Sequence, residues 1–220
     1  MKKPATRAAT SPATESRPGL HARLKTRLQD GMGALRDAYA AKANPKRLLS
    51  GRCRLVDGVL ADLWRATSLP DELAFAAVGG YGRGELYPAS DVDLLILLPE
   101  SITPETERRL EDLVGTFWDI GLDIGHSVRT LAECLAESAR DITIQTSLLE
   151  ARLIGGDHTA FSRLCLAMHA QLDLKTYFSA KHLEQDQRYT RYEQTPYSLE
   201  PNCKESPGGL RDLQVIGWIA

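Results

Sequence analysis

Apolar positions in the first third of this 220-residue chain recur with the spacing of helices. Between residues 19 and about 43 they recur every three to four positions, which predicts an amphipathic helix. Asn44-Pro45 follows as a capping residue and a first-turn proline, and predicts a second helix that ends before Pro70. We therefore expect residues 19–70 to form an N-terminal helical region, preceded by a disordered tail at residues 1–18.

Beyond Pro70, apolar runs predict three strands of a small sheet, at residues 73–78, 91–98 and 122–129. Residues 79–86 predict a turn that leads into a short helix, and residues 104–120 predict a longer helix. This order is typical of a small mixed sheet with helices packed against it. From residue 131 the spacing is helical, over about 131–151, 158–172 and 174–193, and a linker at 195–207 leads to a further helix. The predicted domains are a core at 71–150 and a helical region at 151–220.

The stretch AVGGYGRGELYPASDVDLLILL, residues 77–98, carries the candidate chemistry. Asp91 and Asp93 stand two positions apart where a strand is predicted to begin, so both side chains point to one face. Two such carboxylates repel each other unless a cation lies between them. Mg²⁺ takes oxygen ligands and commonly bridges carboxylates to phosphates, and Gly79 and Gly80 let the backbone approach those phosphates. The pattern predicts a nucleoside triphosphate site with Mg²⁺, or alternatively Mn²⁺.

The order of an apolar residue, Gly-Gly, about ten residues and Asp-apolar-Asp resembles the nucleotidyltransferase superfamily that includes DNA polymerase beta. More narrowly, GGYGRGELYPASDVDLLIL resembles the bifunctional uridylyltransferase/uridylyl-removing enzymes that modify the PII nitrogen-signalling protein. Two later stretches resemble the same family, GHSVR at 125–129 and LEPNCKESPGGLRD at 199–212. The resemblance runs from about residue 73 to 220. It implies an α+β fold, with a polymerase-beta-like nucleotidyltransferase core flanked by N-terminal helices and a C-terminal helical region.

The resemblance implies transfer of UMP from UTP to a tyrosine of the PII protein in the cytoplasm, with release of pyrophosphate. It makes Asp91 and Asp93 metal ligands. Superfamily members usually add a third carboxylate from the next strand, for which Asp123 is our candidate because its apolar neighbours alternate with it. Asp123 would ligate the metal and accept the proton of the attacking hydroxyl. Asp119 is the competitor, but we expect it at the end of a helix.

The glycine-rich turn supplies the candidate nucleotide-binding residues. Gly79 and Gly80 would hold the triphosphate through backbone N–H groups, and Gly82 would keep the loop open. Arg83 either pairs with phosphate or is a surface arginine at the start of a helix. Ser90 either hydrogen-bonds phosphate or caps the turn before the carboxylates.

The amino-acid composition limits the kinds of binding partner and site that we expect. The net charge of −2 gives no bulk attraction to nucleic acid, so no nucleic-acid partner is expected. Residues 1–54 nevertheless carry 13 Lys/Arg against 3 Asp/Glu, either as solvated faces or as a docking surface for an acidic partner. The four cysteines are widely spaced and predict neither a zinc site nor a disulfide framework. No apolar run approaches the roughly 20 residues of a membrane span.

Other functions stay open at this point. None of the five histidines is followed by Asp, so we expect no HD-type hydrolase here, nor the ligand-sensing modules of the resembled family, and we expect a truncated last helix. The alternatives are an adenylyltransferase acting on glutamine synthetase, a non-catalytic nucleotide-binding regulatory module, and a nucleotidyltransferase for nucleic acid. The SPGGLRD stretch favours the uridylyl branch, and the intact carboxylates argue against decay of the site.

Overall fold

Nine helices and one four-stranded sheet make up residues 17–192 and 202–219, the part of the chain that this computed structural model describes. This mixture confirms the predicted α+β class with a small mixed sheet. The expected disordered tail lies almost entirely outside the described residues, as does the first part of the linker expected at 195–207. Both expectations stay predictions.

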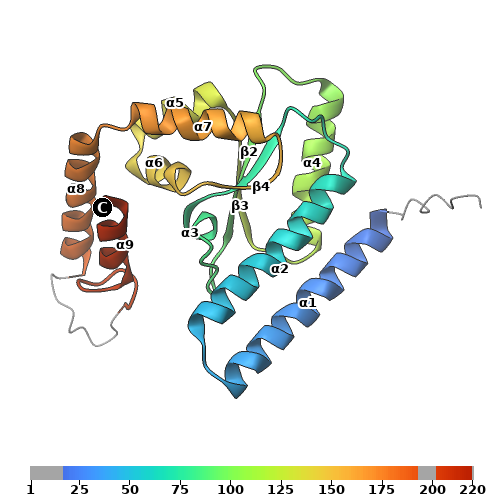
Figure 1. The fold of residues 1–220 in the computed structure, drawn as a ribbon, viewed down its shortest axis with the longest axis horizontal. Helices are drawn as coiled ribbons and strands as arrows, with labels where there is room; N and C mark the ends of the chain where they lie inside the picture. Colours follow the sequence, from blue (N-terminus) through green and yellow to red (C-terminus); the bar gives the residue numbers. More distant parts are fainter. Residues whose placement is uncertain (1–16, 193–201, 220) are drawn as a thin grey trace, which may run out of the picture.

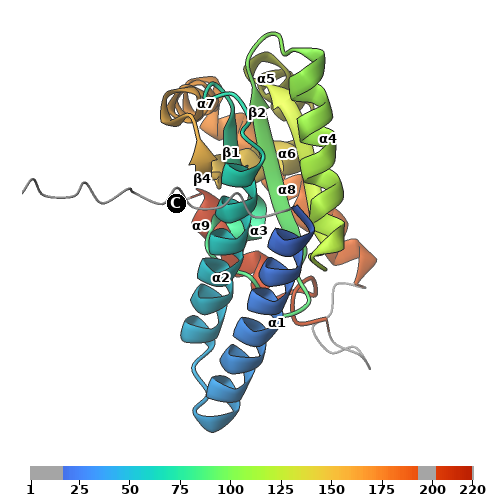
Figure 2. The ribbon, with the colours of Figure 1, turned by 90° about the vertical axis from the view of Figure 1, so that its right-hand side faces the viewer.

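Two long helices precede the sheet, as predicted. α1 spans Arg17–Ala41 and α2 spans Pro45–Ala66. The Asn44 side chain accepts a hydrogen bond from the Arg47 N–H and so caps α2. The two helices form an antiparallel hairpin that reaches beyond the sheet (Figures 1 and 2). Part of α2 therefore packs on the core while the tip of the hairpin projects from it.

The sheet has the strand order β3-β2-β1-β4. The three predicted strands are β1 (Ala74–Ala77), β2 (Val92–Leu98) and β3 (Ile124–Thr130). β1 pairs antiparallel with β2, and β2 pairs parallel with β3, so the sheet is mixed. The fourth strand, β4 (Arg152–Gly156), pairs antiparallel with the other edge of β1.

The presence of β4 corrects the helical reading of the region after residue 131. The helix expected at 131–151 is two helices, α5 (Leu131–Arg140) and α6 (Ile142–Leu149), because Asp141 ends the first and caps the second through two backbone N–H groups. β4 then follows, and its half-buried side chains show neither strict alternation nor a continuous apolar run. It completes the sheet beyond residue 150, where we placed the end of the core.

Helices α2 and α4 (Pro104–Asp119) cover one face of the sheet (Figure 2). Phe75 of β1 stacks there between Trp64 and Phe117, with ring centroids 4.9 and 6.1 Å apart. All three rings are buried, which fixes both helices against the sheet. The short helix expected after the Gly-Gly turn is the turn itself, α3 (Gly79–Gly82).

The other face of the sheet is covered by α5, α6 and α7 (His158–Gln171) around Leu95 and Leu97 of β2. Because side chains alternate along a strand, Val92 is buried on the α4 face and Asp93 points to the α6 face. The core thus packs on both faces of β2, and Asp93, the first acidic residue of this strand, points toward α6.

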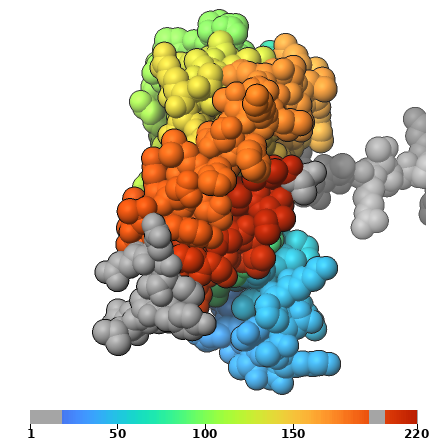
Figure 3. All heavy atoms as spheres, turned by 90° about the vertical axis from the view of Figure 1, so that its left-hand side faces the viewer, coloured from blue at the N-terminus to red at the C-terminus, as the bar shows by residue number. Residues whose placement is uncertain are grey.

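Beyond α6, α8 (Leu174–Arg191) and α9 (Leu210–Ile219) stand side by side, away from the sheet (Figure 1). Figure 3 shows this pair as the block between the α7 region above and the α1–α2 hairpin below. None of the helices in the described part of the chain is long and apolar enough to cross a membrane.

Candidate functional site

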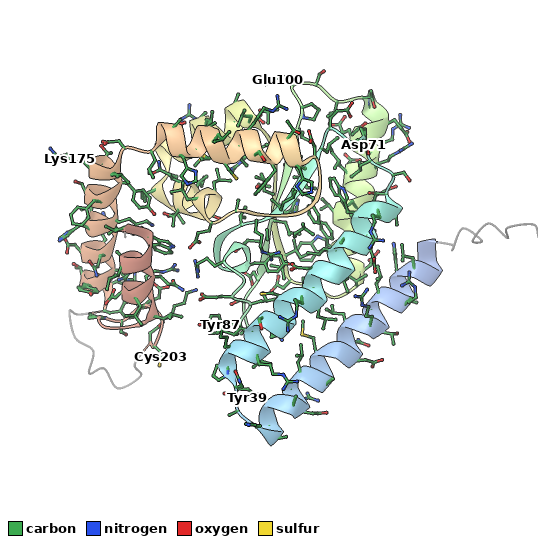
Figure 4. The ribbon with its side chains drawn as sticks, viewed as in Figure 1. Tyr39, Asp71, Tyr87, Glu100, Lys175 and Cys203 are labelled. Carbon is green, nitrogen blue, oxygen red and sulfur yellow. The ribbon has the colours of Figure 1, made fainter. Side chains whose placement is uncertain are left out.

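A cavity of about 630 Å³ lies between the start of β2 and the α8–α9 pair. Its core side is formed by α3, the loop after it, the beginning of β2 and α6. Its other side is formed by α8, α9 and the turn before α9. Tyr87 and Cys203, labelled in Figure 4, line it from these two sides.

The structure brings the predicted carboxylates and glycines together in this cavity. Asp91 and Asp93 line it where β2 begins, and Gly79 and Gly80 line it beside them. A Cβ atom on Gly79 would lie 3.5 Å from Oδ2 of Asp93, and one on Gly125 would lie 2.7 Å from Oδ1. Gly125 is the register partner of Asp93 on β3. The Asp93 carboxylate therefore lies in a cradle between two glycines.

Neither carboxylate of the pair contacts a cation among the residues that the structure describes. Asp93 is exposed as a residue, but partial desolvation of its carboxylate and the neighbouring charge of Asp91 raise its pKa above the ordinary value, while Lys204 acts to lower it. Within residues 17–192 and 202–219, neither aspartate side chain makes an ion pair or a hydrogen bond. Two adjacent, uncompensated carboxylates are a donor set that suits a hard divalent cation.

Asp123 is not gathered into the same cluster. It is exposed, precedes β3 and does not line the cavity, although its carbonyl accepts the Val92 N–H at 2.8 Å. The pairing of Val92 with Ile124 carries on to place Asp123 beside Asp91. No group of three or more His, Cys, Asp and Glu residues that could hold a metal occurs in the described residues. The role of Asp123 stays a prediction based on register.

Gly82 has a different role from the expected loop opening. It is buried at the end of α3, and a Cβ atom there would lie 2.2 Å from the carbonyl oxygen of Glu150. Only glycine allows this approach to the end of α6. Ser90 lines the cavity together with the carboxylates, and its backbone N–H donates to the Tyr87 carbonyl at 3.1 Å.

Arg83 lines the cavity as well, but it is already paired. Its guanidinium donates to both oxygens of Glu150, at 2.6 and 2.7 Å, and to Glu85 at 3.3 Å. Although burial acts to lower it, these two carboxylates hold the pKa of Arg83 above its ordinary value. Arg83 is thus held by protein carboxylates in the structure, and contact with phosphate would require it to exchange one of them.

The cations on the opposite wall were not predicted from the sequence. Lys181, Lys204 and Arg211 line the cavity together with Trp218. The Lys181 ammonium lies 4.5 Å and the Arg211 guanidinium 5.5 Å from the centre of the Trp218 ring. The Trp218 N–H donates to Glu150, which joins this wall to the core. The only sequence signal was the 199–212 stretch, to which spacing alone assigns no role.

The core wall of the cavity thus carries Asp91 and Asp93, with Arg83 neutralised by Glu85 and Glu150, and the opposite wall carries Lys181, Lys204 and Arg211 beside Glu184. A carboxylate pair that faces cations suits a metal-bound polyphosphate. A family model described as a nucleotidyltransferase domain matches residues 60–143, which run from α2 to the start of α6. Fold, site and match define a nucleotidyltransferase domain.

A second model, described as GlnD PII-uridylyltransferase, matches residues 176–220 and so covers α8 and α9. Curated relatives are named bifunctional uridylyltransferase/uridylyl-removing enzyme. The Aromatoleum aromaticum protein is 52% identical over 90% of this chain and 23% of its own length. The Nitrosospira multiformis protein is 49% identical over 93% of this chain and 24% of its own. The chain belongs to this family and spans about a quarter of the length of these relatives.

Proposed function

We propose that this chain transfers UMP from UTP to a tyrosine hydroxyl of the PII protein, in the cytoplasm, with release of pyrophosphate. The observation that carries the proposal is the pairing of Asp91 and Asp93 beside Gly79 and Gly80 in one cavity. The choice of uridylyl group and of PII rests on the names of the relatives and of the matching family model.

Asp91 and Asp93 fit a divalent cation, because the two carboxylates lie together and no cation of the described residues forms an ion pair with either of them. They would hold Mg²⁺, or Mn²⁺, and a bound ion would stabilise negative charge on the phosphate oxygens. Asp123 is proposed as the third carboxylate on strand register alone.

The proposed transfer is a nucleophilic displacement at phosphorus. The tyrosine oxygen forms a bond to the α-phosphorus of UTP, and the bond from that phosphorus to the oxygen bridging the β-phosphate breaks. Pyrophosphate leaves with the bridging oxygen, and the hydroxyl proton passes to Asp123 in our proposal. Gly79 and Gly80 would allow the triphosphate to approach the backbone, and Ser90 would donate a hydrogen bond to it. Positioning and charge compensation supply most of the rate in such a reaction.

The test is transfer of radiolabel from α-³²P-UTP to purified PII protein in the presence of Mg²⁺. Asp93→Asn should lower the rate by at least about a hundredfold, because the uncharged amide binds the metal poorly. Asp71→Asn is the matched control, since Asp71 is exposed, lies in the loop before β1 and is distant from the cavity (Figure 4). Asp123→Asn should reduce transfer to a similar degree.

The adenylyltransferase and the nucleotide-binding module each predict a different result. Label from α-³²P-ATP on glutamine synthetase, without label from UTP on PII, would identify an adenylyltransferase. A folded chain that binds UTP without transfer to either protein would be a nucleotide-binding module. Full activity of Asp93→Asn would refute the proposed metal site.

A further inference from the structure

The turn at residues 202–209, called the 202–209 turn below, is closed by hydrogen bonds between its own side chains and backbone. The Asn202 side-chain oxygen accepts the backbone N–H groups of Lys204 and Glu205, both at 3.0 Å. The Ser206 hydroxyl, on a residue that is 5% exposed, accepts the Asn202 N–H at 3.1 Å. These bonds fix the backbone on both sides of Lys204.

Glycines and the partly buried Asp212 fix the other end of the turn. Gly208 has a φ of +78°, and a Cβ atom on Gly209 would lie 2.8 Å from the Ser206 carbonyl oxygen. Asp212 accepts the Gly208 N–H at 2.7 Å and the Tyr189 hydroxyl at 2.6 Å, and it is ion-paired with the buried Arg188. The turn is therefore anchored to α8 in one conformation.

This rigid backbone presents two cations to the cavity, Lys204 within the turn and Arg211 in the first turn of α9. Lys204 makes no ion pair or hydrogen bond through its ammonium within the part of the chain that the structure describes, and its charge acts on Asp93. Arg211 keeps one ion pair, at 3.3 Å to Glu205.

The two other cations of the cavity are more fully neutralised. Lys181 pairs with Glu184 at 2.7 Å, and Arg83 is held by two carboxylates. Lys204 and Arg211 are thus the cations best able to receive an anion. They lie across the cavity from Asp91 and Asp93, so an anion between the walls meets carboxylates on one side and these cations on the other.

We propose that the 202–209 turn and the first turn of α9 form a polyphosphate-binding element, in which Lys204 and Arg211 bind the β- and γ-phosphates of the nucleoside triphosphate. The assignment of these phosphates rests on the proposed nucleotidyl transfer. Both cations would also stabilise the charge that accumulates on pyrophosphate as it leaves. The turn, which lies outside the predicted core, thereby becomes half of the site.

The test is binding of inorganic tripolyphosphate and of UTP to the 220-residue chain, measured by isothermal titration calorimetry with and without Mg²⁺. Lys204→Ala should weaken binding of both by roughly tenfold to a hundredfold, the loss expected for one charge-assisted hydrogen bond. Arg211→Ala should do the same, and Arg211→Lys should recover part of the affinity while preserving the charge. Lys175→Ala is the control, because Lys175 is exposed on α8 and does not line the cavity (Figure 4).

Unchanged tripolyphosphate and UTP affinity in both alanine variants, with circular dichroism like that of the unmodified chain, would overturn the inference. Two outcomes separate it from the proposed function. Tripolyphosphate binding that depends on Lys204, in a chain that transfers no nucleotide, would support the element and refute the transfer. Normal transfer by Lys204→Ala and Arg211→Ala, with an unchanged KM for UTP, would support the transfer and refute the element.

Discussion

At Asp93 the requirements of the site oppose the stability of the fold. The carboxylate is placed beside Asp91 and between Gly79 and Gly125, where burial and like charge make its ionised form unfavourable. In the unfolded chain the desolvation is lost and the repulsion from Asp91, two residues away, is weakened by solvent. A cation bound by the pair would relieve the repulsion, so the metal-free protein carries a cost that the loaded protein does not.

We therefore expect Asp93→Asn to raise the Tm of the metal-free chain at pH 7. The pKa of Asp93 is raised in the folded state, so the folded protein gains stability when this group is protonated and loses it as the pH rises through that pKa. The neutral amide should accordingly have its full advantage at pH 7, lose it as the pH falls through the raised pKa of Asp93, and have none below the ordinary aspartate value of 3.8. Thermal melts of both proteins between pH 3.5 and about 7.5 measure this. An equal Tm of the two proteins at every pH would show that the ionised Asp93 side chain does not destabilise the folded state.

Gly125→Ala tests the cradle directly. Its Cβ atom would lie 2.7 Å from Oδ1 of Asp93, the end of a side chain that can rotate away at little cost to the fold. We expect unfolding free energy within about 1 kcal/mol of the original and a kcat reduced by about a hundredfold, because the carboxylate is displaced. Gly115→Ala on α4, where the added Cβ meets nothing within 4 Å, is the control and should keep full activity. Equal activity of the two variants would contradict the cradle.

At the scale of elements, α3 is held from behind by helix α2 and strand β4. The Tyr81 hydroxyl donates to Asp57 at 2.5 Å, and Arg152 donates to both oxygens of Asp57 at 3.0 Å. Arg152 also donates to the carbonyls of Tyr81 and Gly82, each at 3.3 Å. The glycine turn that faces the cavity is thus fixed by residues about 20 positions before it and about 70 after it.

Tyr81→Phe should destabilise the fold by about 1.5 kcal/mol, since it removes a hydrogen bond to a partly exposed carboxylate. Burial and Asp57 both raise the pKa of Tyr81, so the hydroxyl stays protonated and acts as the donor. We also expect a higher KM for UTP, because α3 is held less firmly. Urea denaturation gives the first quantity and initial rates the second. Tyr39→Phe, at an exposed tyrosine of α1, should change neither (Figure 4).

Elements were predictable from the sequence where the signal was local. The strands β1, β2 and β3 and the carboxylate pair were found because apolar runs and the Asp-Val-Asp spacing lie within a few residues. Strand β4 was missed because it is a half-buried edge strand whose pairing with β1 comes from residues about 75 positions earlier. The division of the expected helix at Asp141 was missed because its only sign in the sequence is the capping residue Asp141 itself.

At the scale of the molecule, the site is shared between two parts that are far apart in sequence. The glycines and the Asp91–Asp93 pair come from residues 79–93, and the cations on the opposite wall come from residues 181–211. No local pattern reports such a juxtaposition, which is why Lys204, Arg211 and Trp218 could not be assigned from the sequence. Glu150, at the end of α6, joins the parts, because it accepts hydrogen bonds from Arg83 of the core and from Trp218 of α9.

Glu150→Gln should therefore loosen α9 without unfolding the sheet. The substitution removes the charge that pairs with Arg83 and leaves a single oxygen to accept the Trp218 N–H. Amide hydrogen exchange in residues 210–219 should become roughly tenfold to a hundredfold faster, whereas exchange in β1–β3 should stay the same. Glu137→Gln, which breaks an exposed 3.1 Å pair with Arg140 on α5, is the control and should alter neither region. Unchanged exchange in α9 would mean that apolar contacts such as that of the buried Val215 hold the helix in place.

Because Arg211 lies on α9, a loosened α9 in Glu150→Gln should also weaken tripolyphosphate binding. The contact of Glu150 with both parts would then affect the site that the two parts share.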